Sequence, residues 1–299
     1  MTTTEATAYN YVRRGIAGTR AELARAMGIS RPTASAVTDA LISSGLLRDG
    51  GKGHSAGGRS PTLLVPCPEA FSLIGVDLNS SGRVFGVRIN ALGDVTGRTG
   101  GDAPPHSSEQ AAEEILSLWQ RLDPEYSALG IGIAFGRDDP DGRAVTKLLR
   151  RHLIGKYIHF AERLPAAALS EGFRGSTGTD RDYLFLSLES TLASVVCIGG
   201  RPFFGAHGAA GELCRLPFGI AQENEADSLA AECAVMLRNV LAVLDPGAVV
   251  ISGRFSDMDG EFIRSLKRKL RMFDCRIVAA KFGEFSAARG AALQTHFSI

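Results

Sequence analysis

Cysteine is scarce in this chain, and no two cysteines stand at the spacing of a metal or disulfide motif. The five cysteines are widely scattered and include no Cys-x-x-Cys pair. This argues against a zinc knuckle and a disulfide framework, so we expect no metal, no cofactor and a reducing cytoplasm. No run approaches about 18 consecutive apolar residues, which argues against a membrane span. The first residues also lack the charged-then-apolar pattern of an export signal.

Composition and charge are those of a globular protein with a basic start. The 299 residues are 44% hydrophobic and 22% charged, which allows two or three compact units with many glycine turns. The net charge of +1 hides an asymmetry, because residues 1–65 hold eight Arg and Lys against four Asp and Glu. A basic head on a mildly acidic body is expected if only the head meets phosphate.

Residues 19–41 predict two short helices joined by a tight turn. Thr19 and Glu22 have the spacing of a capping box that opens the first helix. Gly28 can take the left-handed conformation that ends it. Ser30 then caps a second helix, and Pro32 lies in its first turn, where a missing amide is harmless. This is the layout of a helix-turn-helix.

The second helix is expected to face the first with Ala34, Val37 and Leu41 and to present its polar side to a major groove. Short hydroxyls and an arginine near a helix N-terminus suit both phosphate and base-edge contacts. The alternative is a helical hairpin with no DNA-binding role. The expected contact residues from the helices are Thr19, Arg20, Ser30, Arg31, Pro32, Thr33, Ser35, Ala36 and Thr38.

A β-hairpin wing is predicted after the helices. Strands at residues 45–48 and 62–65 flank a glycine-rich segment that carries Lys52 and His54. Arg59 is extended beside two glycines, so it is expected to enter a narrow minor groove, with Lys52 as a further contact. The alternative is a flexible linker with a solvated arginine. His54 alone is interpreted as a surface residue.

From residue 70 the pattern changes to alternating strands and helices. Strands are predicted at residues 71–77, 83–89, 129–135, 183–188, 248–251 and 276–279. Helices are predicted at residues 111–122, 164–173, 226–244, 260–272 and 286–294. The sequence therefore predicts an α/β body built from two successive lobes.

Together with this order, several motifs resemble the ROK family (repressors, open reading frames and kinases). The resemblance implies a winged helix-turn-helix domain at residues 1–66 and a two-lobed, actin-like ATPase body of ribonuclease H-like type at 67–299. Lobe one would cover about 70–175 plus a closing helix at 285–299, and lobe two about 180–284. The matching segments are Thr19–Asp49, Gly58-Arg-Ser-Pro61, Gly75-Val-Asp77, Gly130-Ile-Gly-Ile133, Ala166-Ala-Ala-Leu-Ser-Glu171, Gly208-Ala-Ala-Gly-Glu212 and Gly290-Ala-Ala292.

The phosphate loops of the family's kinases are altered here. The family's first loop reads Asp-x-Gly-Gly-Thr, whereas this chain has Asp77-Leu-Asn-Ser-Ser-Gly82. The second, a repeated Gly-x-Gly, is replaced by Glu189-Ser-Thr-Leu-Ala-Ser-Val195. Side chains stand where backbone amides would approach phosphate.

The catalytic base is also missing. Registered on Ala166 to Glu171, the family motif places its aspartate base at Arg163 and a sugar-binding asparagine at Glu162. Arginine cannot accept a proton near neutral pH, so the resemblance predicts a body without enzymatic activity.

The family's sugar and zinc motif, Gly-Glu-x-Gly-His, appears as Gly211-Glu-Leu-Cys-Arg215, without the cysteine cluster that should follow. Cys214 is interpreted as a small buried hydrophobe. The arginines could bind an anionic sugar derivative, or they could pair with glutamates across a filled cleft. The candidate ligand-binding residues are Glu162, Arg163, Glu171, Glu212 and Arg215.

The densest basic run, residues 264–271, is expected to form a solvated helix face, with Leu266 and Leu270 toward the core. A docking surface is the alternative.

These features favour a cytoplasmic DNA-binding regulator, with repression as the expected direction of control. A homodimer or homotetramer would present two recognition helices to a palindromic operator in double-stranded DNA. The body would serve oligomerisation and, with a sugar or anionic sugar derivative as effector, sensing. Two alternatives stay open: a carbohydrate kinase with a vestigial head, and a protein-binding scaffold.

Overall fold

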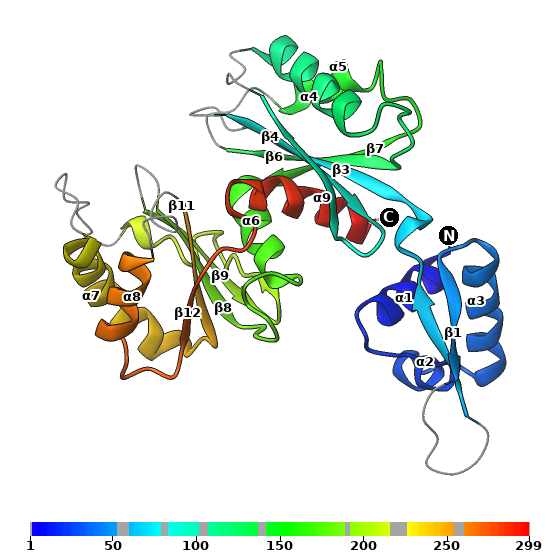
Figure 1. Cartoon of the computed structure of the whole chain (residues 1–299), viewed down its shortest axis with the longest axis horizontal. Helices are drawn as coiled ribbons and strands as arrows, with labels where there is room; N and C mark the ends of the chain where they lie inside the picture. The colour runs from blue at the N-terminus through cyan, green and yellow to red at the C-terminus, as the bar shows by residue number, and fades with distance from the viewer. Residues whose placement is uncertain are drawn as a thin grey trace.

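The computed structural model of the chain contains a small N-terminal head and a larger body with two sheets (Figure 1). It describes residues 2–52, 60–78, 83–101, 107–136, 142–188, 192–215, 226–253 and 260–298. None of the helices in these ranges is long and apolar enough to cross a membrane.

The head is three helices and a two-stranded antiparallel sheet, as a winged helix-turn-helix requires. Its core contains the side chains of Leu23, Leu41, Leu47 and Leu64, each no more than 5% exposed. The elements are α1 (Thr3–Arg13), α2 (Arg20–Met27), α3 (Arg31–Ser43), β1 (Leu47–Lys52) and β2 (Thr62–Pro66). The wing tip, with the predicted His54 and Arg59, lies outside the described residues.

Helix α1 was not predicted from the sequence. A capping box opens it: the Thr2 side chain accepts from the amide of Glu5, and the Glu5 carboxylate accepts from the amide of Thr2. Its buried face carries Ala8, Tyr9 and Val12. The motif was visible in the sequence and marks the start of an additional helix.

The predicted helix-turn-helix is confirmed, with one correction at its first cap. Gly28 ends α2 with φ of 65°, and Ser30 caps α3 by accepting from the amide of Thr33. Thr19 caps α2, but the expected capping box is wrong in one half. The Glu22 carboxylate accepts from the amide of Gly18 at 2.8 Å instead of from that of Thr19.

Lobe one is built on a five-stranded sheet in the order β5-β4-β3-β6-β7. Strands β3, β6 and β7 are parallel, so their carboxyl ends meet at one edge. The elements are β3 (Ser72–Leu78), β4 (Val84–Asn90), β5 (Val95–Gly100), α4 (Ser108–Leu122), β6 (Gly130–Phe135), α5 (Gly142–Leu149), β7 (Tyr157–Glu162) and α6 (Arg163–Gly172).

Lobe two has a second five-stranded sheet in the order β10-β9-β8-β11-β12. The elements are β8 (Tyr183–Leu188), β9 (Leu192–Ile198), β10 (Arg201–Pro202), α7 (Ala226–Leu244), β11 (Ala248–Gly253), α8 (Glu261–Lys269), β12 (Arg276–Ala279) and the returning α9 (Ser286–Ser298). The sequence did not predict strands β9 and β10 of this lobe. In lobe one it did not predict β5, α5 and β7.

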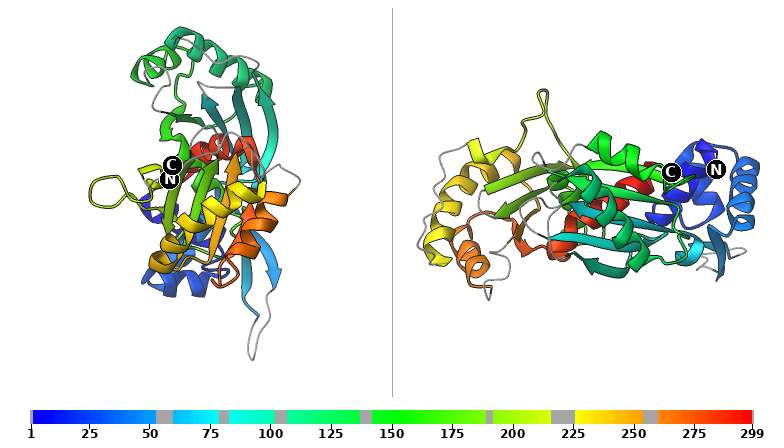
Figure 2. Two further views of the ribbon diagram at one scale, coloured as in Figure 1. Left: turned by 90° about the vertical axis from the view of Figure 1, so that its left-hand side faces the viewer. Right: turned by 90° about the horizontal axis from the view of Figure 1, so that it is seen from above.

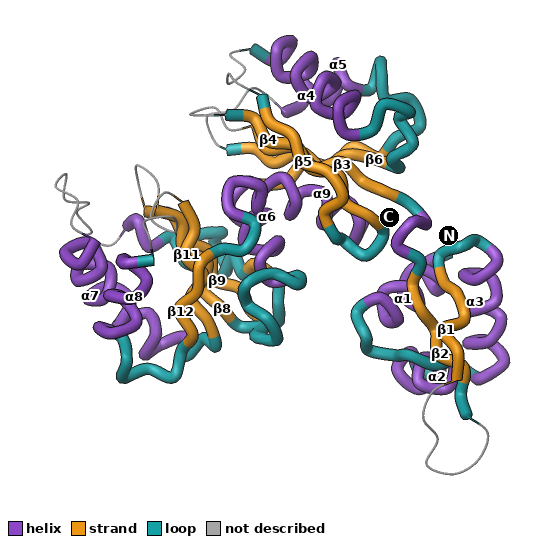
Figure 3. The backbone as a smooth tube through the Cα atoms, viewed as in Figure 1, coloured by secondary structure: helices purple, strands orange, loops and turns teal. Residues whose placement is uncertain are grey.

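The body is layered. Helices α4 and α5 cover the outer face of the first sheet, and α7 and α8 cover the outer face of the second (Figure 3). Helices α6 and α9 lie between the two sheets, where a cluster of buried alanines joins them to β8 and β11. Helix α9 packs on lobe one although it follows lobe two in the chain. Its end, the C-terminus, lies beside the N-terminus in the views of Figures 1 and 2.

Candidate functional site

The N-terminal half of α3 presents an exposed polar surface. Arg31, Pro32, Thr33 and Ala36 are exposed, and Ser35 is half-buried. The Ser30 hydroxyl accepts from the Thr33 amide at 3.2 Å and contacts the Thr33 hydroxyl at 2.7 Å. This end of the helix therefore offers hydroxyls, a cation and the positive end of the helix dipole together, which suits contact with a phosphate backbone.

Two of the predicted DNA-contacting residues are buried, and for them the prediction is wrong. Thr38 is 0% exposed, and its hydroxyl donates to the carbonyl oxygen of Ala34 at 2.7 Å. Thr19 is 6% exposed and caps α2. A hydroxyl can be buried when it bonds to its own backbone, so both residues support the head's structure and neither can reach a duplex.

The predicted contact Arg20 is held within the head. Its guanidinium pairs with Asp39 of α3 at 2.8 Å and approaches Asp49 of β1 at 3.6 Å. These ion pairs connect α2 to α3 and to the wing. The Arg20 side chain is still 31% exposed, so part of it remains accessible to solvent. Lys52 is exposed at the end of β1, and Arg59 lies outside the described residues.

A second site lies in the body at the carboxyl ends of the parallel strands of lobe one. This is where open α/β sheets bind ligands. Arg163, the first residue of α6, donates from Nε to the Asp77 carboxylate at 2.7 Å and also to the carbonyl oxygen of Leu78. Asp77 is 4% exposed, and the guanidinium lies so close to Gly136 that a Cβ there would meet it at 2.9 Å. An internal ion pair therefore fills this position.

The remaining candidate ligand residues are not brought together with Arg163. Glu162 is exposed at the start of α6. Glu171 is 0% exposed and accepts five hydrogen bonds from surrounding loops, so the prediction that it binds a ligand is wrong. Its carboxylate has no open side because chain donors surround it.

Glu212 and Arg215 form a local pair in lobe two. The Nε atom of Arg215 lies 2.5 Å from the Glu212 carboxylate, so the expected pairing with a glutamate is present, but it joins residues three apart and does not cross a cleft. Arg163 pairs instead with Asp77, a partner that the sequence had not assigned to it. The surviving aspartate beside a lost base was the signal that could have predicted the pair. Cys214 is exposed, so its interpretation as a buried residue is wrong.

The basic run of α8 agrees with the predicted solvated face. Leu266 and Leu270 are at most 2% exposed. Arg268 and Lys269 pair with the exposed Asp227 of α7 at 2.8 and 3.0 Å. Hydrogen bonds from Ser265 and Lys269 lower the pKa of Asp227 to about 2, so the carboxylate stays ionised into more acidic solution than an ordinary aspartate does.

Of the altered phosphate loops, residues 79–82 and 189–191 lie outside the described part of the chain. Within the described part, no cluster of three or more His, Cys, Asp or Glu side chains has the arrangement of a metal site.

No family model matches the chain. The xylose repressor of Caldicellulosiruptor bescii is 26% identical over 213 residues, which is 65% of this chain and 53% of that protein. The xylose repressor of Bacillus subtilis is 24% identical over 215 residues, or 65% of this chain and 55% of that protein. The chain thus spans about half the length, 53 to 55%, of these curated relatives.

The fold agrees with a solved ROK family transcriptional regulator, a homologue of the E. coli MLC protein. The two superpose with a TM-score of 0.74 at 15% identity, over 98% of this chain and 96% of that one. A ROK hexokinase from Thermus thermophilus has a TM-score of 0.62 at 17% identity, over 76% of this chain and 99% of the kinase. The regulator thus matches nearly the whole chain, whereas the kinase matches about three quarters of it. Both have the predicted two-lobed fold.

Proposed function

We propose that the chain is a member of the ROK family and a transcriptional repressor that binds double-stranded DNA through its head, residues 1–66. The observation that carries the proposal is the exposed N-terminal half of α3, where Ser30, Arg31 and Thr33 stand together on a basic head. The similarity to two xylose repressors supports it. A repressor acts where the genome is, so we place its action in the cytoplasm.

In the proposed complex, α3 lies in the major groove and the wing contacts the flanking backbone. The contact set is Arg20, Ser30, Arg31, Pro32, Thr33, Ser35, Ala36, Lys52 and Arg59. The body, residues 67–299, would join two or four copies, so that paired heads read a palindromic operator.

DNA binding is tested with duplexes selected from a randomised library by the purified protein. We expect a palindromic consensus and an affinity that falls with salt at a log–log slope of about −0.9 per phosphate contact. A scaffold that docks proteins would select no consensus and would show no such slope. Failure to enrich any duplex at low ionic strength would contradict the proposal.

We further propose that the body is catalytically inactive. A sugar kinase needs a carboxylate free to accept the proton of a sugar hydroxyl, and losing such a base typically costs about 10²–10⁴-fold in rate. Here Arg163 occupies that position in the family motif, and its ion pair engages the neighbouring Asp77. The alternative, a carbohydrate kinase with a vestigial head, requires that another residue act as the base.

Restoring a carboxylate by Arg163→Asp is expected not to create kinase activity. The variant would still lack the glycines of both phosphate loops, residues 77–82 and 189–195, where side chains stand in place of the backbone amides that approach phosphate. A coupled ATP-turnover assay with a panel of hexoses and pentoses measures this for wild type and variant. Sugar-dependent turnover by the wild-type protein would show that the body is an enzyme after all.

An effector, if the body binds one, is expected to be a neutral sugar. Arg163 and Arg215 are both already paired with carboxylates, so neither favours an anionic sugar derivative. The names of the relatives make xylose the first sugar to titrate against a protein–operator complex.

A further inference from the structure

Helix α9 is fixed in lobe one by direct backbone contacts. A Cβ at Gly290 would lie 1.7 Å from the carbonyl oxygen of Ala166 in α6. A Cβ at Gly75 of β3 or at Gly132 of β6 would lie 2.0 Å from a carbonyl oxygen of α9. Because no side chains separate these backbones, α9, α6 and the first sheet must move as one unit.

The first turn of α9 lies at the connection between the lobes. The chain crosses from lobe one to lobe two at residues 173–182 and returns at 280–285, and we call these two segments the interlobe hinge. The buried Glu171 accepts from the amides of Lys281 and Phe282 at 2.9 and 3.0 Å. It also accepts from the amide of Ser176 at 3.1 Å. One carboxylate therefore holds both crossings together.

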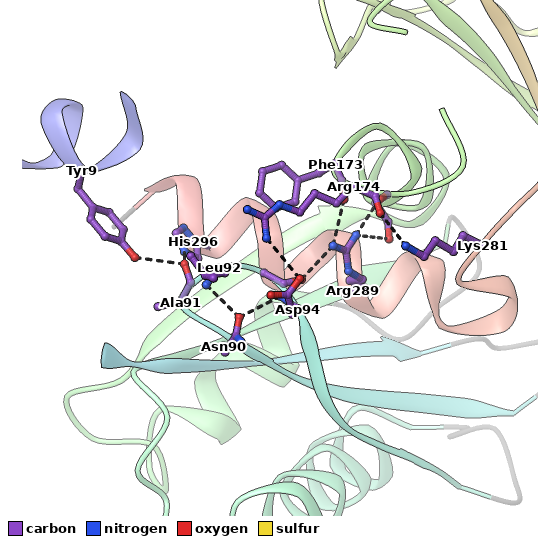
Figure 4. Close-up of polar contacts among 12 residues, drawn as sticks. Tyr9, Asn90, Ala91, Leu92, Asp94, Phe173, Arg174, Lys281, Arg289 and His296 are labelled. Carbon is purple, nitrogen blue, oxygen red and sulfur yellow. Dashed lines mark hydrogen bonds and ion pairs between the residues drawn. The ribbon is translucent and has the colours of Figure 1, made fainter. Parts of the chain in front are cut away.

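Arg289, one turn further along α9, is 1% exposed and joins this hinge to lobe one. Its guanidinium donates to the carbonyl oxygens of Phe173 at 3.0 Å and of Gly93 at 2.9 Å. It also lies 3.9 Å from the ring centroid of Phe282, on the returning segment. Figure 4 shows Arg289 on α9 beside Phe173, Arg174 and Asp94.

The last turns of α9 contact the head. His296 is 5% exposed and lies 2.8 Å from the carbonyl oxygen of Ala91, which also accepts from the Tyr9 hydroxyl of α1 at 3.2 Å (Figure 4). The buried Arg13 of α1 lies within hydrogen-bond distance of both ring nitrogens of His296, Nδ1 and Nε2. Burial and the neighbouring Arg13 lower the pKa of His296 to about 4. The ring is therefore neutral, with one nitrogen to donate to Ala91 and one to accept from Arg13.

Head and hinge meet on shared groups. In the turn at residues 90–94, the carbonyl oxygen of Ala91 accepts a hydrogen bond from the Tyr9 hydroxyl of the head, and that of Gly93 accepts one from Arg289. Asp94 of the same turn pairs with Arg174 of the hinge at 3.4 Å. The ring centroid of Phe173 lies 5.7 Å from the guanidinium carbon of Arg13 in the head and 5.9 Å from that of Arg289. A change in the hinge segments therefore reaches the groups that hold the head.

We propose that Arg289, Phe173 and His296 are positioning residues that join the angle of the head to the angle between the two lobes. The inference rests on the proposed function, because the head's angle matters through the spacing of two recognition helices on DNA. In an oligomer, any event that changes the lobe angle would change that spacing, and DNA binding would in turn bias the lobe angle.

The test measures the head and the hinge separately, without DNA. Spin labels at Ala40→Cys in α3 and Glu113→Cys in α4, both exposed positions, report the distance from the head to lobe one. The two cysteines that are not buried, Cys214 and Cys275, are first replaced by Ser. We expect one narrow distance peak in the parent protein and its loss in Arg289→Met, although within the described residues Arg289 donates only to lobe one and the hinge and not to the head.

The reciprocal measurement is amide hydrogen exchange at the hinge. His296→Phe, which removes both ring nitrogens, is expected to speed exchange at Lys281 and Phe282, whose amides bond to Glu171. The matched control, His296→Gln, keeps a donor and an acceptor and should preserve both the distance peak and the slow exchange.

A head whose docking is purely structural would behave differently. In that case His296→Phe would broaden the head distance and leave hinge exchange unchanged, and Arg289→Met would keep the narrow peak, which would overturn the proposal. Thermal unfolding by circular dichroism confirms that each variant is folded. If Arg289→Met does not fold, Ser286→Ala removes a single donor to Glu171 at the same end of α9. Failure to bind DNA would contradict the proposed function without changing either measurement.

Discussion

Replacing Arg31 with alanine is expected to weaken operator binding by about 1–3 kcal/mol per head, or roughly 5- to 150-fold. Arg31 is exposed at the first turn of α3, and no hydrogen bond or ion pair holds its side chain among the described residues. It is thus available to a base edge or a phosphate. In a symmetric dimer both heads lose the contact, so the effect on the free energy of binding doubles.

The substitution should leave the head folded. An exposed side chain away from caps and buried pairs usually changes the free energy of unfolding by no more than about 0.5 kcal/mol. Titration of a fluorescent operator duplex, together with thermal unfolding, therefore separates lost recognition from lost structure.

Two comparisons sharpen this prediction. Arg31→Lys keeps the charge and loses the planar fork, so it should retain the salt dependence and lose preference for the operator over a scrambled duplex. Thr33→Ala should weaken binding without changing the salt slope. An Arg31→Ala protein with unchanged preference for the operator would place recognition elsewhere on the head.

The second large effect is expected in the body. Gly290→Ala should lower the free energy of unfolding by about 3 kcal/mol, at the upper end of what overpacking costs. The added methyl would meet the backbone carbonyl of Ala166 at 1.7 Å, and a backbone atom cannot rotate away as a side chain can. Helices α6 and α9 would be forced apart, and with them the layer between the two sheets.

Urea unfolding followed by circular dichroism measures this effect, and Gly100→Ala is the matched control. A Cβ at Gly100 would meet its nearest neighbour, the carbonyl oxygen of Val84, at 3.4 Å, an ordinary contact. The free energy of unfolding of the control should therefore lie within about 1 kcal/mol of the wild-type value, since replacing a strand glycine by alanine does not by itself destabilise the strand. Equal free energies of unfolding for the two variants would contradict the prediction, because helices α6 and α9 would then have moved apart without destabilising the protein.

Sequence reasoning succeeded where structure is set by local chemistry. The caps at Thr19 and Ser30 and the turn at Gly28 follow from hydrogen bonds within a few residues, and the structure has them. The prediction that Thr38 contacts DNA was wrong because it relied on the hydroxyl group and ignored the position of the residue along α3. It stands four residues after Ala34 and three before Leu41, on the buried face of α3, and its hydroxyl bonds within the helix.

The sequence by itself determined the head, the alternation of strands and helices in the body, and the loss of the family's base. Each of these features depends on residues that lie close together in the chain. Only the tertiary structure decided what the buried charges do. Arg163 found a partner 86 residues away, Glu171 one 115 residues away, and Arg13 one 283 residues away. Local periodicity carries no information about such pairs, since they form only when packing brings distant elements together and removes the water that would otherwise solvate them.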